Sequence, residues 1–427
     1  MNNPSRTGQT ENLLTCLGCN LLCDDLEQSG GITEFELKLK QICPRGANWL
    51  RRSQEKIEIP ARLLEHRILE AITWLQAAHA PLWIIDHQQS LAASQSIMAT
   101  AEKSRGILVL PASQIAEGAN RAASHVGQVV CSLGDVRSRA DTIILWGCDP
   151  ASSHPRLIER LGHHVHQGRG SNRSLQWIVV GDVSPSSIQQ LTLSGQTVRR
   201  FPWDKDLTFS KLQLLRSMIR QQNQQVAVSS ADASVAELAE LLRSTRYGCL
   251  FFGEAFCQPE MAALATESLQ RLVIELNDGR AFHSQYLANH GDFGMGSVVC
   301  TWQTGYAGAI SFQQGQIDHD GNRFSVERLL REQSTDCLVL VGDHALEHIP
   351  QASIAQMAAQ PVIWFRSCSI ECSFPQLVDI RVQRDGLDRR AVFHRLDQLT
   401  IPARAWNDST LPDLAAVLDK IRNGLSR

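Results

Sequence analysis

Four of the twelve cysteines stand close together near the start of the chain, at spacings that could hold a metal centre. Cys16, Cys19 and Cys23 fall within eight residues, and Cys43, which precedes a proline, follows a predicted hairpin over residues 30–40. Three thiolates this close in sequence can converge only if the backbone wraps a single centre. Cysteine followed by proline is a recurrent fourth ligand of iron–sulfur clusters. The pattern predicts a [4Fe–4S] cluster, with structural zinc or a metal-free thiol cluster as the alternatives.

The other eight cysteines are scattered, and several lie within apolar runs. They are Cys131, Cys148, Cys249, Cys257, Cys300, Cys337, Cys368 and Cys372. Free cysteines are among the most buried residue types, so we expect most of these to be inert thiols inside the protein. The first residues of the chain lack the apolar core of a secretory signal peptide. We therefore expect a cytoplasmic protein without a disulfide framework.

A second group of candidate residues follows the ends of predicted strands. In the sharpest case, the apolar run 142–146 stops at Gly147 and opens into a loop over residues 148–155. Glycine lets the backbone turn or approach a ligand closely, and Pro150 ends the strand because proline donates no hydrogen bond. Ligands of open α/β sheets bind at the carboxyl ends of the strands. The predicted cofactor-binding residues at such ends are Gly147, Asp149, Ser153, His154, Gly181, Asp182, Gly342 and Asp343.

Short apolar runs and helical patterns alternate along most of the chain. Buried strands are predicted at residues 81–86, 106–110, 142–146, 176–182, 249–254, 337–343 and 362–365. Helical spacing of apolar residues occurs at residues 62–77, 90–103, 207–221, 231–243, 259–276 and 411–425. Strands that alternate with helices predict βαβ units, so the expected fold class is α/β with parallel, Rossmann-like sheets.

Two stretches break this pattern. Residues 113–130 are small and polar and are expected to form a loop. Residues 278–325 are glycine-rich and are expected to be irregular. Long ordered loops of this kind usually cover a ligand site or a partner surface.

The length of 427 residues predicts more than one domain. We expect a small cysteine-cluster domain at residues 1–58, a first α/β domain at 59–205, a second with long loops at 206–384, and a C-terminal extension at 385–427. The net charge of −3 gives no electrostatic footprint for nucleic acid. No apolar run approaches the ~20 residues needed to span a bilayer. Neither nucleic acid nor a membrane is therefore expected as a partner.

Five stretches together resemble the B subunit of formylmethanofuran dehydrogenase, in the molybdopterin oxidoreductase superfamily. They are the cysteine cluster, WGCDPASSHPR (146–156), TWQTGY (301–306), GDHALEHIP (342–350) and FHRLDQLTIPAR (393–404). That protein holds tungsten or molybdenum on two pterin guanine dinucleotides beside a [4Fe–4S] cluster. The resemblance, which runs from about Cys16 to Arg404, implies domains of the molybdopterin oxidoreductase type. It also implies a pterin dinucleotide contact around Asp149, where the family more often has asparagine.

Two positions depart from the family's pattern. The family's metal-ligating cysteine or selenocysteine lies in a Cys-His-Gly loop ahead of the LGD stretch, whereas the closest match here contains Ser124 and His125. The family also has an Arg-Gly-His stretch near the metal, and residues 289–291 here read Asn-His-Gly. A serine ligates molybdenum in other branches of the superfamily, so Ser124 is an alternative ligand. If Ser124 is not a ligand, the metal-binding thiolate of the family has no counterpart here. The arginine that would pair with a formyl or carboxylate group is also missing.

Loss of both groups resembles one subfamily, the formyltransferase/hydrolase complex of bacteria that oxidise formaldehyde through tetrahydromethanopterin. In that complex an amidohydrolase-like A subunit releases formate, and a formyltransferase subunit transfers the formyl group. The resemblance implies a B subunit that binds the A subunit, the formyltransferase and the C subunit, and that scaffolds them without redox catalysis of its own. The alternatives are an active molybdenum or tungsten pterin protein that interconverts formate and CO2, and a generic two-domain α/β nucleotide-binding protein.

Overall fold

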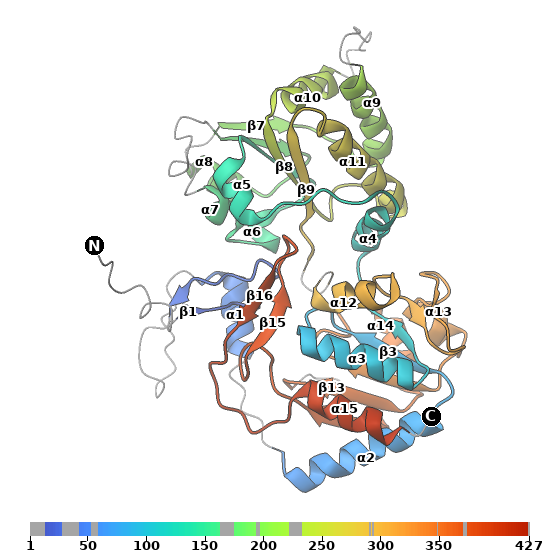
Figure 1. Cartoon of the computed structure of the whole chain (residues 1–427). Helices are drawn as coiled ribbons and strands as arrows, with labels where there is room; N and C mark the ends of the chain where they lie inside the picture. Colours follow the sequence, from blue (N-terminus) through green and yellow to red (C-terminus); the bar gives the residue numbers. More distant parts are fainter. Residues whose placement is uncertain are drawn as a thin grey trace. The chain divides into compact units, whose positions relative to one another are not determined.

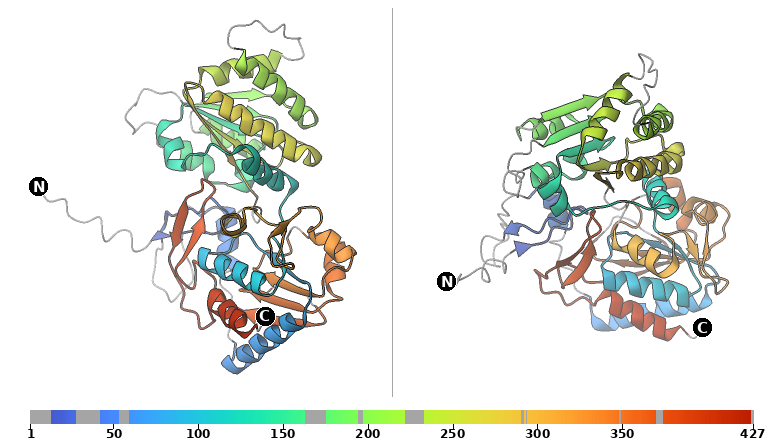
Figure 2. Two further views of the ribbon diagram at one scale, coloured as in Figure 1. Left: turned by 45° about the vertical axis from the view of Figure 1, so that its right-hand side comes forward. Right: turned by 45° about the horizontal axis from the view of Figure 1, so that its top comes forward.

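The computed structural model divides the chain into two compact units. Unit 1 comprises Met1–Ala112, Gly291–Arg395 and Thr400–Arg427, and unit 2 comprises Ser113–His290 and Leu396–Leu399. Figure 1 and Figure 2 show the course of the chain through both units. The structure describes residues 13–27, 42–52, 59–162, 175–193, 197–221, 233–289, 292, 294–347, 349–369 and 374–425. The predicted hairpin over residues 30–40 and the thiol of Cys372 lie outside these residues.

Unit 1 contains a seven-stranded sheet in the order β11-β10-β4-β3-β12-β13-β14. Its parallel strands are β3 (Pro81–Ile85), β4 (Ile107–Val109), β12 (Cys337–Val341), β13 (Val362–Arg366) and β14 (Leu377–Arg381). The short strands β10 (Ile310–Ser311) and β11 (Asp318–His319) add an antiparallel edge beside β4. In chain order the parallel strands are arranged 2-1-3-4-5. This is a doubly wound order whose switch point lies between β3 and β12.

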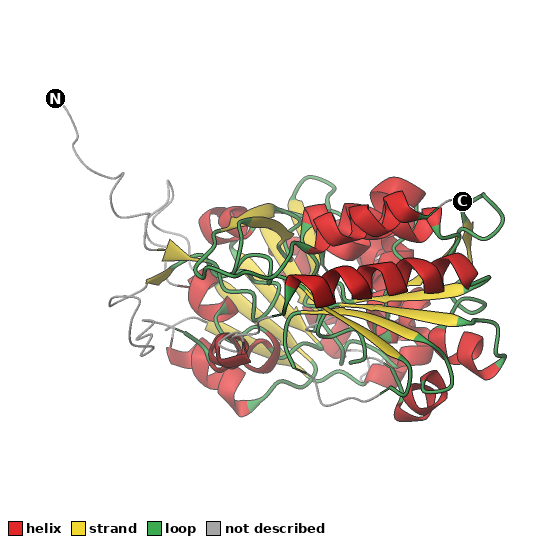
Figure 3. Cartoon of the chain, turned by 90° about the horizontal axis from the view of Figure 1, so that it is seen from below, coloured by secondary structure: helices red, strands yellow, loops and turns green. Residues whose placement is uncertain are grey.

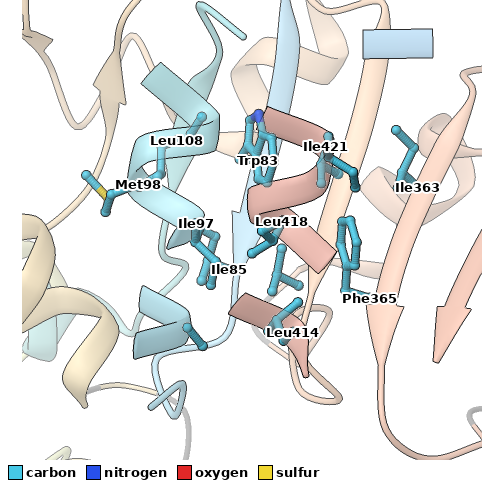
Figure 4. Packing of buried hydrophobic residues seen from close by; sticks show 14 of the residues in the cluster. Trp83, Ile85, Ile97, Met98, Leu108, Ile363, Phe365, Leu414, Leu418 and Ile421 are labelled. Carbon is cyan, nitrogen blue, oxygen red and sulfur yellow. The ribbon is translucent and has the colours of Figure 1, made fainter. Parts of the chain in front are cut away.

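The core of unit 1 lies on both faces of this sheet, because the central strands are apolar along their whole length. Trp83 and Ile85 face one cluster, which is formed by α2 (Ala61–Ala77), α3 (Leu91–Lys103), α12 (Met295–Thr304) and α15 (Leu414–Gly424) (Figure 4). Leu82 and Ile84 face the other, which includes α13 (Val326–Arg331) and α14 (Gln351–Met357). Figure 3 shows helices on both sides of the strands.

Unit 2 contains a five-stranded parallel sheet in the order β7-β6-β5-β8-β9. The strands are β5 (Thr142–Trp146), β6 (Gln176–Val180), β7 (Thr197–Phe201), β8 (Tyr247–Phe252) and β9 (Ala281–Tyr286). Their chain order is 3-2-1-4-5, as in a Rossmann-type sheet, with the switch point between β5 and β8. One face packs against α4 (Gln114–Val126), α9 (Thr208–Arg220), α10 (Ala233–Ser244) and α11 (Ala262–Leu276).

The segment that carries the clustered cysteines packs on a C-terminal hairpin of unit 1. It contains β1 (Leu13–Leu14), β2 (Leu26–Glu27) and α1 (Pro44–Arg52), and the hairpin consists of β15 (Ala391–His394) and β16 (Thr400–Ala403). Leu17 and Leu22 are buried against Phe393 and Ala403. The predicted cysteine-cluster domain and C-terminal extension therefore share a small core.

The α/β class with parallel sheets is confirmed, and the predicted strands and long helices lie close to their expected positions. The run 142–146 is β5, and the run 362–365 lies within β13. The loop predicted over residues 148–155 is interrupted by a short helix, α6 (Pro150–Ser153). None of the helices in the described part of the chain is long and apolar enough to cross a membrane.

The loop predicted at residues 113–130 is wrong, because most of that stretch forms helix α4. The Ser113 side chain caps the helix and accepts a hydrogen bond from the amide of Ala116 at 3.2 Å. Ile115, Gly118 and Ala122 are buried, at helical spacing, on one side of α4. Small residues allow this helix to pack closely against a second helix. The stretch therefore lacks the periodic large apolar residues by which a helix is predicted from a sequence.

The irregular stretch predicted at residues 278–325 is also wrong in part. It contains β9 and α12 and the short strands β10 and β11. The TWQTGY motif lies at the end of α12, where Gly305 has a φ of 86° and terminates the helix. Gly305 of this motif therefore ends helix α12, as glycine commonly does at the C-terminal ends of helices.

The two units differ from the predicted consecutive α/β domains at residues 59–205 and 206–384. Cys337 of β12 pairs with Pro81 of β3, so the sheet of unit 1 joins strands from both spans. Thr142 of β5 pairs with Gly248 of β8, so the sheet of unit 2 does the same. Unit 2 is therefore inserted between two parts of unit 1. The boundaries predicted from chain order assumed that neighbouring strands in sequence share a sheet.

Candidate functional site

Two glycines shape the switch point of the unit 2 sheet, where β5 and β8 end. Gly147 has a φ of 54°, and a Cβ at this position would lie 2.4 Å from the backbone of Phe256. A Cβ on Gly253 would lie 2.7 Å from the Cβ of Cys148. The loops that follow β5 and β8 are therefore in backbone contact, and the Ala255 amide donates to the Gly147 carbonyl at 2.9 Å. Glycine is required at position 147 because its φ is positive and because the Cβ of any other residue would clash with the backbone of Phe256.

Asp149 joins the loop after β5 to helix α8 (Pro185–Leu193), which follows β6. Its Oδ1 accepts hydrogen bonds from the hydroxyls of Ser184, at 2.8 Å, and Ser187. Its backbone carbonyl accepts from the amide of Ser153 at 3.0 Å. This carboxylate therefore fixes the loop through internal bonds, and it holds the strand-end loops of β5 and β6 together.

The remaining predicted residues of unit 2 lie at different depths around this loop. His154 is fully buried, and its Nδ1 lies 3.0 Å from the Ser153 hydroxyl. Gly181 follows β6 with a φ of 86°, and its amide donates to the Phe201 carbonyl at 2.9 Å. Asp182 is exposed. Gly181 and Asp182 therefore lie at the surface end of the edge, while His154 supports the loop from inside.

A polar cluster at the same switch point was missed from the sequence. The Ser113 hydroxyl donates to Glu254 Oε1 at 2.8 Å, and the Tyr286 hydroxyl also donates to this oxygen. The two hydroxyls are 3.4 Å apart, and all three side chains are half-buried. They come from the N-cap of α4, the loop after β8 and the end of β9. In the sequence, the only indication of this cluster was Glu254 at the end of the run 249–254, because Ser113 and Tyr286 are distant from it in the chain.

Unit 1 has its own switch point, where Asp86 follows β3. Asp86 is buried, its Oδ1 accepts from the amide of Gln88 at 2.8 Å, and its Oδ2 accepts from the amide of His344 at 3.3 Å. Gly342, with a φ of 102°, packs so closely that a Cβ would lie 2.5 Å from the Cβ of Asp86. The predicted residue Asp343 accepts from the amides of Ser367 at 2.8 Å and Cys368 at 3.2 Å. These carboxylates thus order the loops at the ends of β3, β12 and β13.

His344 lies among carboxylates at this edge. Burial lowers the pKa of His344, but the hydrogen bond to Glu347 and the charges of Asp86, Glu347 and Asp343 outweigh it and raise the pKa to about 9. The imidazole is therefore protonated at neutral pH. The imidazolium is paired with Glu347, and three carboxylates surround it, so its charge serves to hold these loops together.

The four clustered cysteines are brought together by the loop of residues 16–23 and the start of α1. The Gly18 amide donates to Cys16 Sγ at 3.4 Å, and the Gly46 amide donates to Cys43 Sγ at 3.4 Å. A Cβ on Gly46 would lie 3.0 Å from Cys16 Sγ, so this glycine lies against both sulfurs. Burial raises the pKa of Cys19 to about 12, and it also raises the pKa of Cys16.

The donor set of this cluster suits a soft metal or an iron–sulfur centre, in which amide hydrogen bonds to sulfur are common. Among the residues that the structure describes, however, no three His, Cys, Asp or Glu side chains are placed to hold a metal ion. The cysteines are neighbours, and their convergence on a metal stays a prediction.

Comparison with known proteins agrees with the motifs. No protein-family model matches the chain. Over 317 residues it is 26% identical to the B subunit of tungsten-containing formylmethanofuran dehydrogenase 2 from Methanocaldococcus jannaschii, with 71% of each protein covered. Over 411 residues it is 23% identical to the protein of the same name from Methanococcus maripaludis, with 92% of each covered. The chain is a homologue of the formylmethanofuran dehydrogenase B subunit. The resemblance drawn from the motifs is thus confirmed.

A bacterial complex gives two further matches. Over 107 residues the chain is 28% identical to the B subunit of the formyltransferase/hydrolase complex Fhc of Methylorubrum extorquens, which covers 25% of the chain and 28% of that protein. A chain in the crystal structure of the formyltransferase/hydrolase complex FhcABCD from the same organism, bound to methylofuran, superposes with a TM-score of 0.66. That chain is 20% identical, and the match covers 85% of the present chain and 96% of that one. The structural likeness supports the α/β fold.

Homology to the formylmethanofuran dehydrogenase B subunit makes the placement of Ser124 important. Ser124 is exposed near the end of α4, and its hydroxyl donates to the Asn120 carbonyl of the same helix at 3.1 Å. His125 is also exposed and lies 3.5 Å from a carboxylate oxygen of Glu267 on α11. Asn289 is half-buried after β9, and the following His290 and Gly291 lie outside the described residues. Ser124 and His125 thus lie on the exposed surface of the last turn of α4, and each side chain has a partner within unit 2.

Proposed function

We propose that the chain is the B subunit of a cytoplasmic formyltransferase/hydrolase-type complex in tetrahydromethanopterin-linked one-carbon metabolism. In this role it scaffolds an amidohydrolase-like A subunit, a formyltransferase and a C subunit, and it carries out no redox chemistry of its own. Support comes from the homology to the B subunits of formylmethanofuran dehydrogenase and of the Fhc complex. Formate leaves such a complex by hydrolysis, so the B subunit needs no electron path.

The observation that carries the proposal is Ser124. The hydroxyl that stands in for the family's thiolate ligand is bonded to its own helix at Asn120 and lies on an exposed helix surface. A neutral alcohol is a far weaker metal ligand than a thiolate, and Asn289 supplies no positive charge. At these two positions the chain therefore lacks the charges with which the family would orient a formyl group.

A second candidate function is an active tungsten or molybdenum protein that interconverts formate and CO2. It is favoured by the names of the two relatives that match most of the chain, both tungsten-containing formylmethanofuran dehydrogenases. In this case Cys16, Cys19, Cys23 and Cys43 would hold a [4Fe–4S] cluster that carries electrons. In the leading proposal the same cluster has a structural role only.

A pterin guanine dinucleotide, if the chain has kept this cofactor, would find hydrogen-bonding groups at the switch point of unit 2. The hydroxyls of Ser113 and Tyr286 and the carboxylate of Glu254 offer hydrogen-bonding groups at the edge of unit 2. When bound, such a cofactor with its metal supplies oxygen and electron transfer, and the protein supplies binding and orientation.

The deciding experiment measures metal content and two activities on the purified complex. We expect no stoichiometric tungsten or molybdenum, no viologen dye reduction with formate, and full formate release from the formyl substrate. Ser124→Ala should leave formate release unchanged, because the hydrolytic chemistry lies on another protein of the complex. A near-stoichiometric metal, together with dye reduction that is lost in Ser124→Ala, would establish the second candidate.

The scaffold role is tested by co-expression. If the chain exposes surfaces that its partners normally cover, it should be poorly soluble when expressed alone and soluble with an amidohydrolase-like A subunit. Recovery of both chains in one size-exclusion peak is the expected result. A well-behaved monomer with no affinity for the amidohydrolase-like partner would contradict the scaffold role.

A further inference from the structure

The longest stretch of the sequence without a charged residue lies partly on the surface of unit 1. Residues 293–317 contain no Asp, Glu, Lys or Arg, although these four residue types make up 20% of the chain. The first part of the stretch forms α12, and the rest leads through β10 to the start of β11. Three of its large side chains are exposed, Trp302 at 62%, Tyr306 at 43% and Ile317 at 45%. Aromatic residues on a surface depleted of charge are typical of the centre of a protein interface.

Trp302 belongs to a helix that is anchored in the core of unit 1. Val299 and Cys300, within three residues of it, are completely buried among the residues that pack on the sheet. Gly305 ends the helix directly after this turn, and the exposed Gln303 follows Trp302 in the same turn. The indole is therefore exposed to solvent on a fixed backbone. A rigid aromatic side chain of this kind loses little conformational entropy when a partner covers it.

Tyr306 is held in place by a second ring. Its phenol stacks on the imidazole of His319 in β11, with 4.2 Å between the ring centroids and 16° between the ring planes. The Nδ1 atom of His319 lies 2.9 Å from the carbonyl oxygen of Gly308 and 3.1 Å from that of Ala309, so the imidazole is itself fixed by the backbone. Ile317 directly precedes β11. The end of α12 and the start of β11 therefore form one surface, called the aromatic surface below, which consists of Trp302, Gln303, Tyr306 and Ile317.

The charges that follow the aromatic surface in the chain are engaged within their own turn. Asp318 pairs with Arg323, and Asp320 accepts from the amides of Asn322 and Arg323, both at 2.9 Å. The aromatic surface itself has no charged side chain to offer a partner. A charged group buried against it would lose its water without gaining an opposite charge, which is costly. The surface is therefore complementary to an uncharged, apolar partner.

We propose that the aromatic surface is the place where another protein of the complex docks, through an apolar and uncharged patch of its own. This inference rests on the proposed function, which requires partner proteins around this chain. An anionic occupant such as nucleic acid does not suit the surface, because residues 293–317 contain no lysine or arginine. Buried Trp and Tyr side chains dominate the affinity of many protein interfaces, so Trp302 and Tyr306 supply most of the binding here.

The first test measures competition for partners, so it does not need the isolated chain. Wild-type and Trp302→Ala chains are co-expressed in equal amounts with limiting amidohydrolase-like A subunit, formyltransferase and C subunit. The complex is purified through a tag on the A subunit, and both versions of the chain are quantified by peptide mass spectrometry. We expect Trp302→Ala at no more than about a tenth of the wild-type level, and Tyr306→Ala reduced in the same direction. Leu69→Ala, at a side chain 64% exposed on α2 of the same unit, is the matched control and should equal wild type.

Charge substitutions in the same assay test the chemistry of the partner. Gln303→Glu and Gln303→Lys should both lower incorporation, because either charge would be buried against an uncharged patch. The same two substitutions at Gln356, which is exposed on α14, should have no effect. If one charge at position 303 lowered incorporation and the other raised it, the partner's surface would be charged and the proposal would be wrong.

A cross-link identifies the occupant. A photo-reactive amino acid in place of Gln303 should link the chain to another protein of the co-expressed complex. A link to a second copy of this chain, or no link at all, would overturn the proposal. If wild type and Trp302→Ala entered the complex equally well, only this inference would fail. A wild-type chain that entered no complex would refute the proposed function and this inference together.

Discussion

Gly118 of α4 lies directly against Ala262 of α11. A Cβ added to Gly118 would be 2.7 Å from the carbonyl carbon of Ala262 and 2.9 Å from its Cβ. The two helices therefore meet backbone to backbone at this point, where unit 2 starts. The same helix carries Ser113 at its N-cap and Ser124 near its end, so this contact positions both residues.

Substituting Gly118→Ala should destabilise the protein. The added methyl group gains about 0.5–1 kcal/mol of helix propensity, but it forces α4 away from α11 at a cost that exceeds this gain. We expect a net loss of about 1–2 kcal/mol in the free energy of unfolding, measured by urea denaturation. Gly134→Ala in α5 (Leu133–Arg139) is the matched control, because its Cβ would meet only the Ser132 hydroxyl at 3.6 Å. A Gly118→Ala protein as stable as Gly134→Ala would contradict the close packing.

Gly147 and Gly127 allow the two reasons for a glycine, its backbone conformation and its close packing, to be tested separately. Both have positive φ angles, 54° and 81°, but a Cβ on Gly127 would have no neighbour within 4 Å. At φ 81° and ψ 174° the backbone of Gly127 lies in a region open essentially to glycine alone, so Gly127→Ala should cost about 1–3 kcal/mol from backbone strain. Gly147→Ala adds a clash with the backbone of Phe256 and should cost at least about 3 kcal/mol, measured by thermal and urea unfolding. Equal losses in both variants would show that strand-end packing at Gly147 is unimportant.

His344 should make stability depend on pH in a defined direction. Its pKa of about 9 in the folded protein lies above its ordinary value of 6.5. Its contribution is therefore complete below about pH 6.5 and is lost as the pH rises through 9. His344→Gln should lower the free energy of unfolding on the order of 2 kcal/mol at pH 6, and the difference from wild type should shrink towards pH 9.5.

The control for this experiment is His66→Gln. His66 is an exposed residue of α2 whose Nδ1 lies 4.0 Å from Glu70, and surface pairs of this kind contribute little. Its stability should stay within about 0.5 kcal/mol of wild type across the range. A difference between His344→Gln and wild type that grows with pH would reverse the sign and exclude the proposed charge on His344.

The clustered cysteines should bind iron and sulfide if they hold the proposed centre. Protein purified without oxygen should show broad visible absorbance and about four iron and four sulfide per chain, and Cys19→Ser should lose the absorbance. Cys300→Ser is the control, because Cys300 is a buried thiol of α12 outside the cluster. Colourless protein with one zinc per chain would instead support the structural zinc alternative.

The sequence by itself determined the local elements and the motifs. The run 142–146 is apolar throughout and ends at a glycine, so its identity as a buried strand follows from neighbouring residues alone. The homology to the formylmethanofuran dehydrogenase B subunit could also be predicted from short motifs. The small residues of α4 were misread because their packing partner, α11, is distant in the chain.

Only the tertiary structure decided which strands share a sheet and which side chains meet. Strand pairing depends on hydrogen bonding and burial between residues that are distant in the chain. Cys337 pairs with Pro81 although unit 2 lies between them in the sequence, and no local pattern predicts this pairing. Glu254 and Ser113 are brought together in the same way. Each partner is ordinary in its own sequence neighbourhood, and the hydrogen bond between them arises only because the fold brings the N-cap of α4 to the loop after β8.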